Sequence, residues 1–248
     1  MQPLTSVRHG NRDNHNFIIQ NEAMDPAACA PVPPLRAADV LTLQDRLLAD
    51  ASWPRAVPAA ATGAPPLDLW HWVTANHRFN SLLWAEEDLA RRTQVADADI
   101  AANKRAIDRY NQARNDATER VDEWLLQALG LVDAESARTD APRSLAPSTA
   151  RLNSETAGSM VDRLSIMALK VHAMRQQTQR LDVEEAHRAA SLVKLQRLEE
   201  QRGDLAGCLD ALLDDAAAGR AYFKVYRQFK MYNDPRFNPV LVAEAAAR

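Results

Sequence analysis

Apolar residues recur every three or four positions along most of the chain, which is the spacing typical of amphipathic α-helices. Two long stretches without proline carry this pattern, from Leu67 to Ala141 and from Ser148 to Asp234. Because proline disrupts the interior of a helix, such stretches favour long helices. The sequence therefore predicts an all-α, antiparallel bundle of about five long helices. Their expected spans are residues 68–92, 97–129, 159–179, 182–218 and 220–234.

Particular residues refine this picture of the third and fourth helices. The third helix is predicted to open at Ser159, with a capping box that Asp162 completes. Within the fourth helix, Gly203 and Gly207 indicate a bend or a close approach of another helix. Cys208 follows them in a leucine-rich stretch, so we expect its side chain in the core.

Prolines are concentrated near the N-terminus, since nine of the 13 precede Leu67. One short amphipathic run, at residues 40–48, stands out among them. We therefore predict two parts: a Pro/Ala-rich N-terminal arm with one short helix over residues 1–66, and a helical bundle domain over residues 67–248. Residues 132–150 form a second, polar break inside the bundle domain.

Composition narrows the class of protein. The chain has 248 residues, of which 46% are hydrophobic and 25% charged, as in an ordinary soluble globular protein. No stretch approaches the roughly 18 apolar residues of a membrane helix, and residues 1–16 lack the hydrophobic segment of a secretory signal. Two distant cysteines suggest no disulfide framework, which favours a cytoplasmic location. A formal net charge of −3 disfavours nucleic acid as a partner.

Polar residues interrupt the apolar face of the second long helix. Ile107 and Leu125 lie on one face of this helix. The positions between them on that face are polar: Asn111, Arg114, Asn115, Thr118 and Asp122. The first long helix carries a similar band, made of His77, Asn80, Trp84, Glu87, Asp88 and Arg91. If these faces point into the bundle, their polar groups need partners.

Two interpretations of this polar band remain open. In one, its charged residues form interhelical salt bridges that fix the register of the bundle. In the other, the band lines a polar pocket between the first two long helices. A single buried asparagine is enough to fix register. Several amides, each both donor and acceptor, are better suited to a hydroxyl-rich or nucleotide ligand.

The third long helix is apolar on nearly every side and is predicted to be the central helix. Its Asp162, Arg163 and Lys170 are costly inside a bundle unless they pair or face a site. The preceding segment, residues 153–159, offers backbone donors at a helix N-terminus. Simple capping and binding of an external anion both fit that segment.

Cations and aromatic residues are concentrated in residues 220–237. On the helix expected there, Lys224, Arg227 and Lys230 follow one another at intervals of three and share one sector. Cations beside tyrosines suit a phosphate group or a stacked base. The alternative is an amphipathic helix whose aromatic residues pack and whose cations are solvated.

Four motifs, in order, resemble one protein family. They are residues 77–88, 104–116, 152–166 and 226–235, the first of which reads His77-Arg-Phe-Asn-Ser-Leu-Leu-Trp-Ala-Glu-Glu-Asp88. The family is the bacterial domain of unknown function 4254, and the resemblance covers residues 67–242. It transfers no activity. Because such proteins are associated with envelope-polysaccharide and glycosyltransferase gene neighbourhoods, the resemblance implies a sugar or sugar-nucleotide context.

The preferred function is binding of a phosphorylated or nucleotide-linked sugar in cell-envelope glycan assembly. The C-terminal cations would contact phosphate, and the amides would contact hydroxyls or base edges. If catalysis occurs, His77 is the expected proton-transfer residue, because the ordinary pKa of histidine lies near neutrality. Asp88 and Asp122 are the other two expected catalytic residues. The expected ligand-binding residues are Asn80, Glu87, Arg91, Asn111, Arg114, Asn115, Asp162, Arg163, Lys224, Arg227 and Lys230.

Two other functions fit the same sequence. One is an accessory or scaffold bundle that binds a glycosyltransferase and performs no chemistry. The other is a magnesium-dependent nucleotide pyrophosphohydrolase acting through Glu87, Asp88, Glu119 and Asp122, since Glu119-x-x-Asp122 resembles half of the acidic motif in such all-α enzymes. No cofactor and no dedicated metal site are predicted, because the six histidines form no His-x-x-x-His pair. A homodimer is compatible with the sequence.

Overall fold

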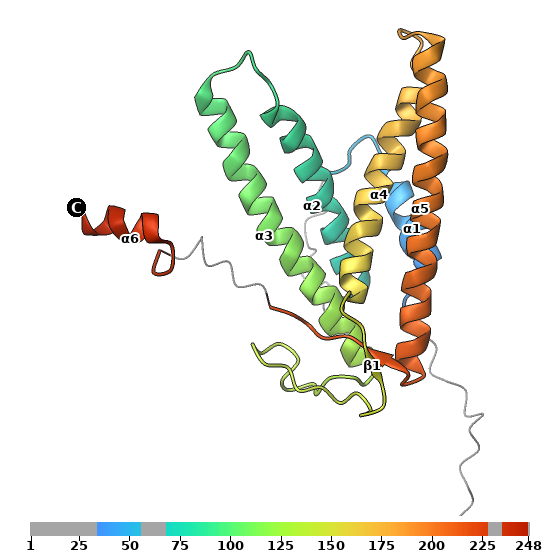
Figure 1. The fold of residues 1–248 in the computed structure, drawn as a ribbon, viewed down its shortest axis with the longest axis vertical. Helices are drawn as coiled ribbons and strands as arrows, with labels where there is room; N and C mark the ends of the chain where they lie inside the picture. The colour runs from blue at the N-terminus through green and yellow to red at the C-terminus, as the bar shows by residue number, and fades with distance from the viewer. Residues whose placement is uncertain (1–33, 56–67, 228–234, 248) are drawn as a thin grey trace, which may run out of the picture. The chain divides into compact units, whose positions relative to one another are not determined.

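The computed structural model describes residues 34–55, 68–227 and 235–247. These belong to one of the two compact units of the chain, residues 31–248; the other, residues 1–30, lies outside the described residues. Helices dominate the described residues, which confirms the all-α prediction (Figure 1). None of these helices is long and apolar enough to cross a membrane. The elements are α1 (Ala37–Ala49), α2 (Leu69–Ala90), α3 (Asp97–Ala128), β1 (Arg151–Leu152), α4 (Ala157–Thr178), α5 (Glu185–Ala217), β2 (Ala221–Tyr222) and α6 (Pro239–Ala246).

Four long helices form two antiparallel hairpins, α2 with α3 and α4 with α5 (Figure 1). Their ends agree with the predicted spans to within three residues. α4 contacts α1, α2, α3 and α5, and its Val161, Leu164 and Val171 are buried. The prediction of a central third helix is therefore confirmed, because a helix that is apolar on nearly every side can pack against neighbours all around.

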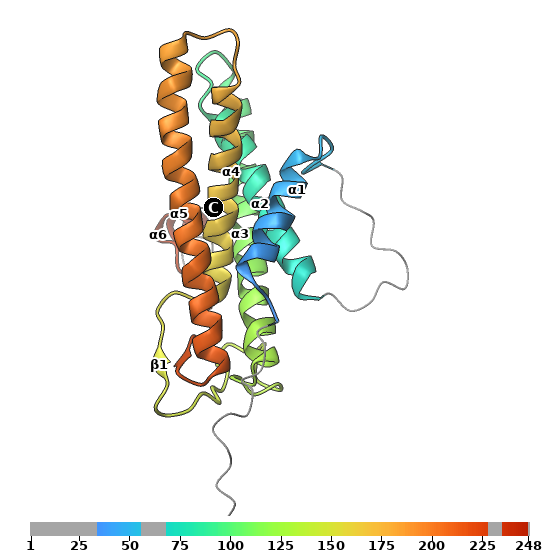
Figure 2. The same cartoon turned by 90° about the vertical axis from the view of Figure 1, so that its right-hand side faces the viewer.

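α1 is attached to the bundle and lies beside α2 and α4 in Figure 2. Its Val40 is buried, and Arg202 of α5 donates a hydrogen bond to Asp45 Oδ1 of α1 at 2.8 Å. The Ala37 N–H donates to Asp210 Oδ1 of α5 at 2.9 Å. These contacts hold α1 in the same compact unit as the long helices, although the sequence assigned it to the N-terminal arm. Most of that arm, residues 1–33 and 56–66, lies outside the described residues.

The expected fifth long helix over residues 220–234 is wrong for the part that the structure describes. α5 ends before Gly219, whose φ of 68° suits a glycine that closes a helix. The chain then continues as an extended segment. Its buried residues alternate with more exposed ones, and the buried ones are Ala221, Phe223 and Val225. This period of two is the pattern of a strand and not of a helix.

A parallel pairing of β1 with β2 holds this extended segment in place. The Arg151 N–H donates to the carbonyl of Arg220 at 2.8 Å, and the Asn153 N–H donates to the carbonyl of Tyr222 at 2.7 Å. The partner strand comes from the loop that precedes α4. The pairing therefore brings the end of α5 next to the start of α4.

Three local expectations also differ from the structure. Thr156, and not Ser159, is the N-cap of α4, because its side chain accepts a hydrogen bond from the Ser159 N–H at 3.1 Å. Cys208 is exposed and does not belong to the core. A Cβ added at Gly203 or Gly207 would meet nothing within 4 Å, so neither glycine marks a close helix contact.

Candidate functional site

A hydrogen-bond network joins three helices where the predicted polar band enters the bundle. At its centre, Asp162 Oδ1 of α4 accepts hydrogen bonds from the Nδ2 atoms of Asn76 and Asn80 on α2, both at 2.8 Å. Asn76 Nδ2 also donates to Thr118 Oγ1 of α3 at 3.0 Å. Arg114 Nε of α3 lies 3.8 Å from the same carboxylate oxygen. Because both asparagines are buried, this part of the band fixes how the three helices pack.

His77 belongs to the same buried network. Its side chain is inaccessible to solvent, its Nδ1 lies 2.8 Å from Ser165 Oγ, and its ring stacks on Trp53 with the centroids 5.5 Å apart. Burial, helped by the positive charge of Arg202, lowers the pKa of His77 to about 4. The imidazole is therefore neutral at neutral pH. This environment disfavours the predicted role in proton transfer, which needs access to a ligand and a pKa near the working pH.

Beside the network, a pocket of about 460 Å³ opens between α2, α3 and α4. Its volume lies in the range of small-molecule sites. Six of the residues predicted for the site line this pocket: Asn80, Glu87, Asp88, Arg91, Asn111 and Arg114. The other lining residues are Leu83, Trp84, Ile166 and Leu169.

The polar wall of the pocket contains side chains that have no internal partner, or only a long or exposed contact, within the described residues. In the described part of the chain, the side chains of Asp88 and Asn111 make no hydrogen bond or ion pair. Arg114 Nε is buried and donates no hydrogen bond. Arg91 Nη2 lies 3.6 Å from Glu87 Oε2, in an exposed pair between residues of the same helix. Such exposed pairs contribute little to stability, so these two charges can also contact a ligand.

The apolar wall was not anticipated from the sequence. Leu83, Ile166 and Leu169 are not among the predicted site residues, yet they form the apolar side of the pocket. Trp84 carried a signal, because it is a large aromatic residue in the middle of a charged helix face. Its 37% exposure reflects its position at the edge of the pocket.

Two predicted ligand-binding residues lie behind the pocket. Asn115 is buried, and its Oδ1 accepts a hydrogen bond from Arg114 Nη2 at 3.1 Å. Asp162 is the centre of the network described above. Both therefore orient Arg114, which itself lines the pocket.

Arg163, Lys224 and Arg227 do not line the pocket. Arg163 points outward and donates to Glu155. Lys224 is exposed, with its ammonium group 5.8 Å from the centroid of the Tyr222 ring. Lys230 lies outside the described residues.

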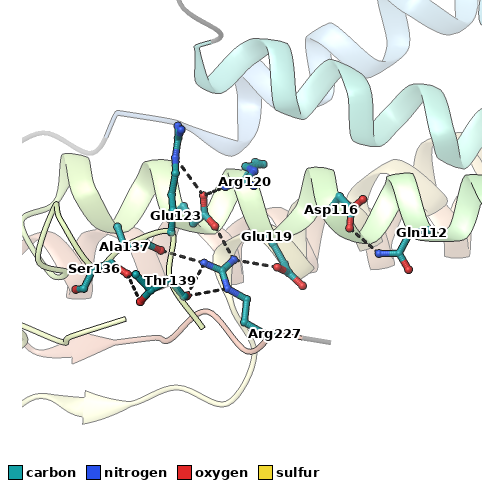
Figure 3. A network of polar contacts seen from close by, with 10 residues as sticks. Gln112, Asp116, Glu119, Arg120, Glu123, Ser136, Ala137, Thr139 and Arg227 are labelled. Atoms are coloured by element: carbon teal, nitrogen blue, oxygen red, sulfur yellow. Dashed lines mark hydrogen bonds and ion pairs between the residues drawn. The ribbon is translucent and has the colours of Figure 1, made fainter. Parts of the chain in front are cut away.

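Arg227 is held by carboxylates at the far end of α3 (Figure 3). Its Nη1 donates to Glu119 Oε2 at 2.9 Å and to Glu123 Oε1 at 2.5 Å, and its other nitrogens donate to the carbonyls of Ala137 and Thr139. Glu123 is 2% exposed, so this ion pair is internal. The helix face expected to carry both Lys224 and Arg227 is wrong, because residues 221–227 are extended and not helical.

Asp122 also lies away from the pocket, at the first turn of α4. Its Oδ1 accepts a hydrogen bond from the Gly158 N–H at 2.6 Å. Burial raises the pKa of Asp122 to about 7, although hydrogen bonds from Thr156 and Gly158 oppose the shift. The N-terminal turn of α4 is thus capped by Thr156 and by an internal carboxylate. Of the two interpretations of residues 153–159, this geometry fits capping.

The four carboxylates considered for magnesium occupy two separate places. Glu87 and Asp88 line the pocket, whereas Glu119 and Asp122 lie toward the other end of α3. Asp122 follows Arg114, the nearer of the two pocket residues on α3, by 8 positions, a rise of about 12 Å along a helix. Across the three described ranges, no group of three or more His, Cys, Asp or Glu residues is placed to hold a metal ion.

Comparison with known proteins gives one match. A family model described as "Protein of unknown function (DUF4254)" matches residues 70–225, which is more than half of the chain. The matched region includes every residue that lines the pocket. No curated protein and no solved structure matches the chain.

Proposed function

We propose that this chain, which belongs to the family described as "Protein of unknown function (DUF4254)", binds a phosphorylated or nucleotide-linked sugar. The binding site is the pocket between α2, α3 and α4. The observation that carries the proposal is the composition of the pocket wall. Two guanidinium groups, two carboxylates and two amides surround a single volume of about 460 Å³. A ligand that combines phosphate with hydroxyl groups requires this mixture of donors and acceptors.

The phosphate of the ligand binds to Arg91 and Arg114, which reach the pocket from different helices. Arg114 is oriented in advance, because Asn115 accepts a hydrogen bond from its Nη2 and Asp162 lies near its Nε. A guanidinium held in this way loses little freedom on binding and can contact two phosphate oxygens at once. Arg91, at the C-cap of α2, is more exposed and can move toward the ligand.

The hydroxyl groups of the ligand bind to Asp88 and Asn111. The Asp88 carboxylate is free to accept hydrogen bonds, and the Asn111 amide is free to accept and to donate them. Asn80 contributes at the floor of the pocket, where its amide nitrogen is already engaged by Asp162. Trp84 supplies an aromatic face on which a base can stack. Together with the leucine and isoleucine wall, it shields the polar contacts from water.

This assignment differs from the sequence-based one in two respects. The phosphate contacts come from α2 and α3, because Arg227 is engaged by Glu119 and Glu123. No proton transfer is assigned to His77, so the proposal is one of binding and includes no reaction. A role in envelope-glycan assembly in the cytoplasm is part of the proposal, and the resemblance to proteins from such gene neighbourhoods supports it by association.

Thermal unfolding against a panel of nucleotide sugars and sugar phosphates tests the proposal. A ligand at about 100 times its Kd adds about 2.7 kcal/mol to the free energy of unfolding, which raises the Tm of a domain this size by several degrees. We expect Asn111→Ala to weaken binding about tenfold. Gln112→Ala is the matched control, because Gln112 is exposed, bonded to Asp116 and outside the pocket.

A second pair of variants tests the phosphate contact. Arg91→Gln should weaken binding of the phosphorylated ligand, whereas Arg92→Gln should not, because Arg92 bonds to Leu89 and Asn103 and does not line the pocket. A panel that leaves the Tm unchanged, together with co-purification of a glycosyltransferase, would instead favour the accessory or scaffold bundle.

A further inference from the structure

A second groove of about 460 Å³ shares Trp84 with the polar pocket and continues between α4 and α5. Its surface is mostly apolar, and no acidic residue lines it. The remaining lining residues are Lys170, Ala173, Met174, Gln177, Lys194, Arg197, Leu198 and Gln201. The groove therefore differs in chemistry from the polar pocket beside it.

Three exposed cations border this apolar groove: Lys170, Lys194 and Arg197. Within the described residues, none of their side chains makes a hydrogen bond or an ion pair. Other cations nearby are paired; for example, Arg175 of α4 bonds to Glu199 of α5 at 2.7 Å. An apolar groove bordered by unpaired cations is complementary to a molecule that has an apolar chain and an anionic group.

The two hollows adjoin at Trp84. The indole of Trp84 forms part of both walls, and the adjacent residues Leu169 and Lys170 of α4 line the polar pocket and the groove respectively. Consecutive residues rise by about 1.5 Å along a helix. One molecule can therefore extend from the first hollow into the second.

We propose that the groove holds the hydrocarbon chain of an anionic lipid, with its phosphate at the three cations. The head group beyond the phosphate then enters the polar pocket. This last step rests on the proposed function: the sugar phosphate stays at Arg91 and Arg114, and the ligand class becomes a sugar phosphate joined to a lipid phosphate.

A protein partner fits the groove less well than a lipid chain. Nine residues line the groove, whereas a standard protein interface engages about 20–30 residues on each side. Lysine is also depleted at protein interfaces, yet two lysines border this groove. The size and the charge of the groove both favour a small amphiphile.

Calorimetric titration of the full chain with dodecyl phosphate, below its micellar concentration, tests the inference. We expect saturable binding, with inorganic phosphate at least a hundredfold weaker. Leu198→Gln should weaken dodecyl phosphate about tenfold. The matched control is Leu192→Gln, which changes an exposed leucine of the same helix that does not line the groove. Helix content and Tm of each variant verify that it is folded.

A separate variant tests how much the cations contribute to binding of dodecyl phosphate. The double substitution Lys170→Gln with Lys194→Gln should weaken dodecyl phosphate and leave the melting temperature unchanged, because both side chains are exposed and unpaired. Equal affinity for inorganic phosphate and dodecyl phosphate would overturn the inference. So would a dimer that Leu198→Gln dissociates, because a second copy would then be the occupant.

The two proposals can fail separately. Binding of nucleotide sugars without any binding of dodecyl phosphate overturns the lipid inference and leaves the proposed function standing. Binding of dodecyl phosphate that depends on Leu198, without binding of any sugar, overturns the proposed function and supports the groove as a lipid-phosphate site. If both hold, a sugar phosphate joined to dodecyl phosphate should bind at least tenfold tighter than dodecyl phosphate, and Asn111→Ala should abolish that increment.

Discussion

The carboxylate of Asp122 on α3 accepts a hydrogen bond from the backbone N–H of Gly158 at 2.6 Å, which fastens α3 to the first turn of α4. The contact requires glycine. A Cβ at position 158 would lie 2.6 Å from the carbonyl oxygen of Thr118 and 2.9 Å from the Asp122 carboxylate. Because α3 and α4 also form walls of the polar pocket, this crossing helps to set their separation there.

Replacing this glycine tests the importance of the close approach. Gly158→Ala should lower the free energy of unfolding by about 1–3 kcal/mol, because the backbone of α3 must move to admit the methyl group. Gly207→Ala is the control. An added Cβ at this position, within the length of α5, would meet nothing within 4 Å, so alanine should raise the free energy of unfolding by about 0.5–1 kcal/mol. Urea unfolding measures both changes. Equal effects at the two positions would contradict the crossing described here.

The raised pKa of Asp122 makes stability depend on pH in a defined direction. Between the ordinary value of 3.8 and about 7, the folded state keeps a proton that the unfolded state releases. The free energy of unfolding should therefore fall as pH rises through this window, by about 1.4 kcal/mol per pH unit from this group alone. Below 3.8 and above about 7 this contribution should be constant.

Asp122→Asn removes this contribution because an amide does not titrate. Relative to the wild type, the variant should gain stability between pH 5 and pH 7, as measured by urea unfolding at several pH values. Asp116→Asn, which alters an exposed carboxylate of the same helix, should keep the wild-type slope. Parallel stability curves for the wild type and Asp122→Asn would show that the buried carboxyl does not titrate in this range.

The ion pair of Arg227 should be important for stability. Arg227→Met removes one of the two arginines that bond to Glu123, which is 2% exposed; Arg120 remains, at 2.5 Å. Because the buried carboxylate keeps that partner, the loss should cost about 1–3 kcal/mol. Lys224→Met removes an exposed cation from the same segment and should change stability by no more than about 0.5 kcal/mol. Chemical unfolding distinguishes the two, and similar losses would mean that only net charge matters.

Asp162, the centre of the polar network between α2, α3 and α4, gives a further prediction. Asp162→Ala leaves the buried amide of Asn76 with one acceptor fewer and removes the closest acceptor of Asn80, which should cost about 1–3 kcal/mol. Arg163→Ala, at the next position, breaks only the pair with Glu155 at the surface and should cost less than about 1 kcal/mol. Thermal melts of the two variants, compared with the wild type, measure this difference.

Much of the architecture was predictable because its signals are local. Proline-free stretches with helical periodicity located the four long helices, and the apolar character of α4 marked it as central. The segment after Gly219 was not predictable in the same way. Its cations fit a helical spacing, while Ala221, Phe223 and Val225 fit the alternation of a strand. Pairing with Arg151 and Leu152, about 70 residues earlier in the chain, decides between them.

The sequence by itself determined which polar residues share a face of α2 and α3, because helical geometry alone dictates that. Only the tertiary structure decided how that face divides: His77 and Asn115 became internal contacts, whereas Asp88 and Asn111 became a pocket wall. The reason is physical. Periodicity specifies direction around a helix axis, but the distance to the facing helix varies along its length, and that distance determines whether two polar groups bond to each other or leave room for a ligand.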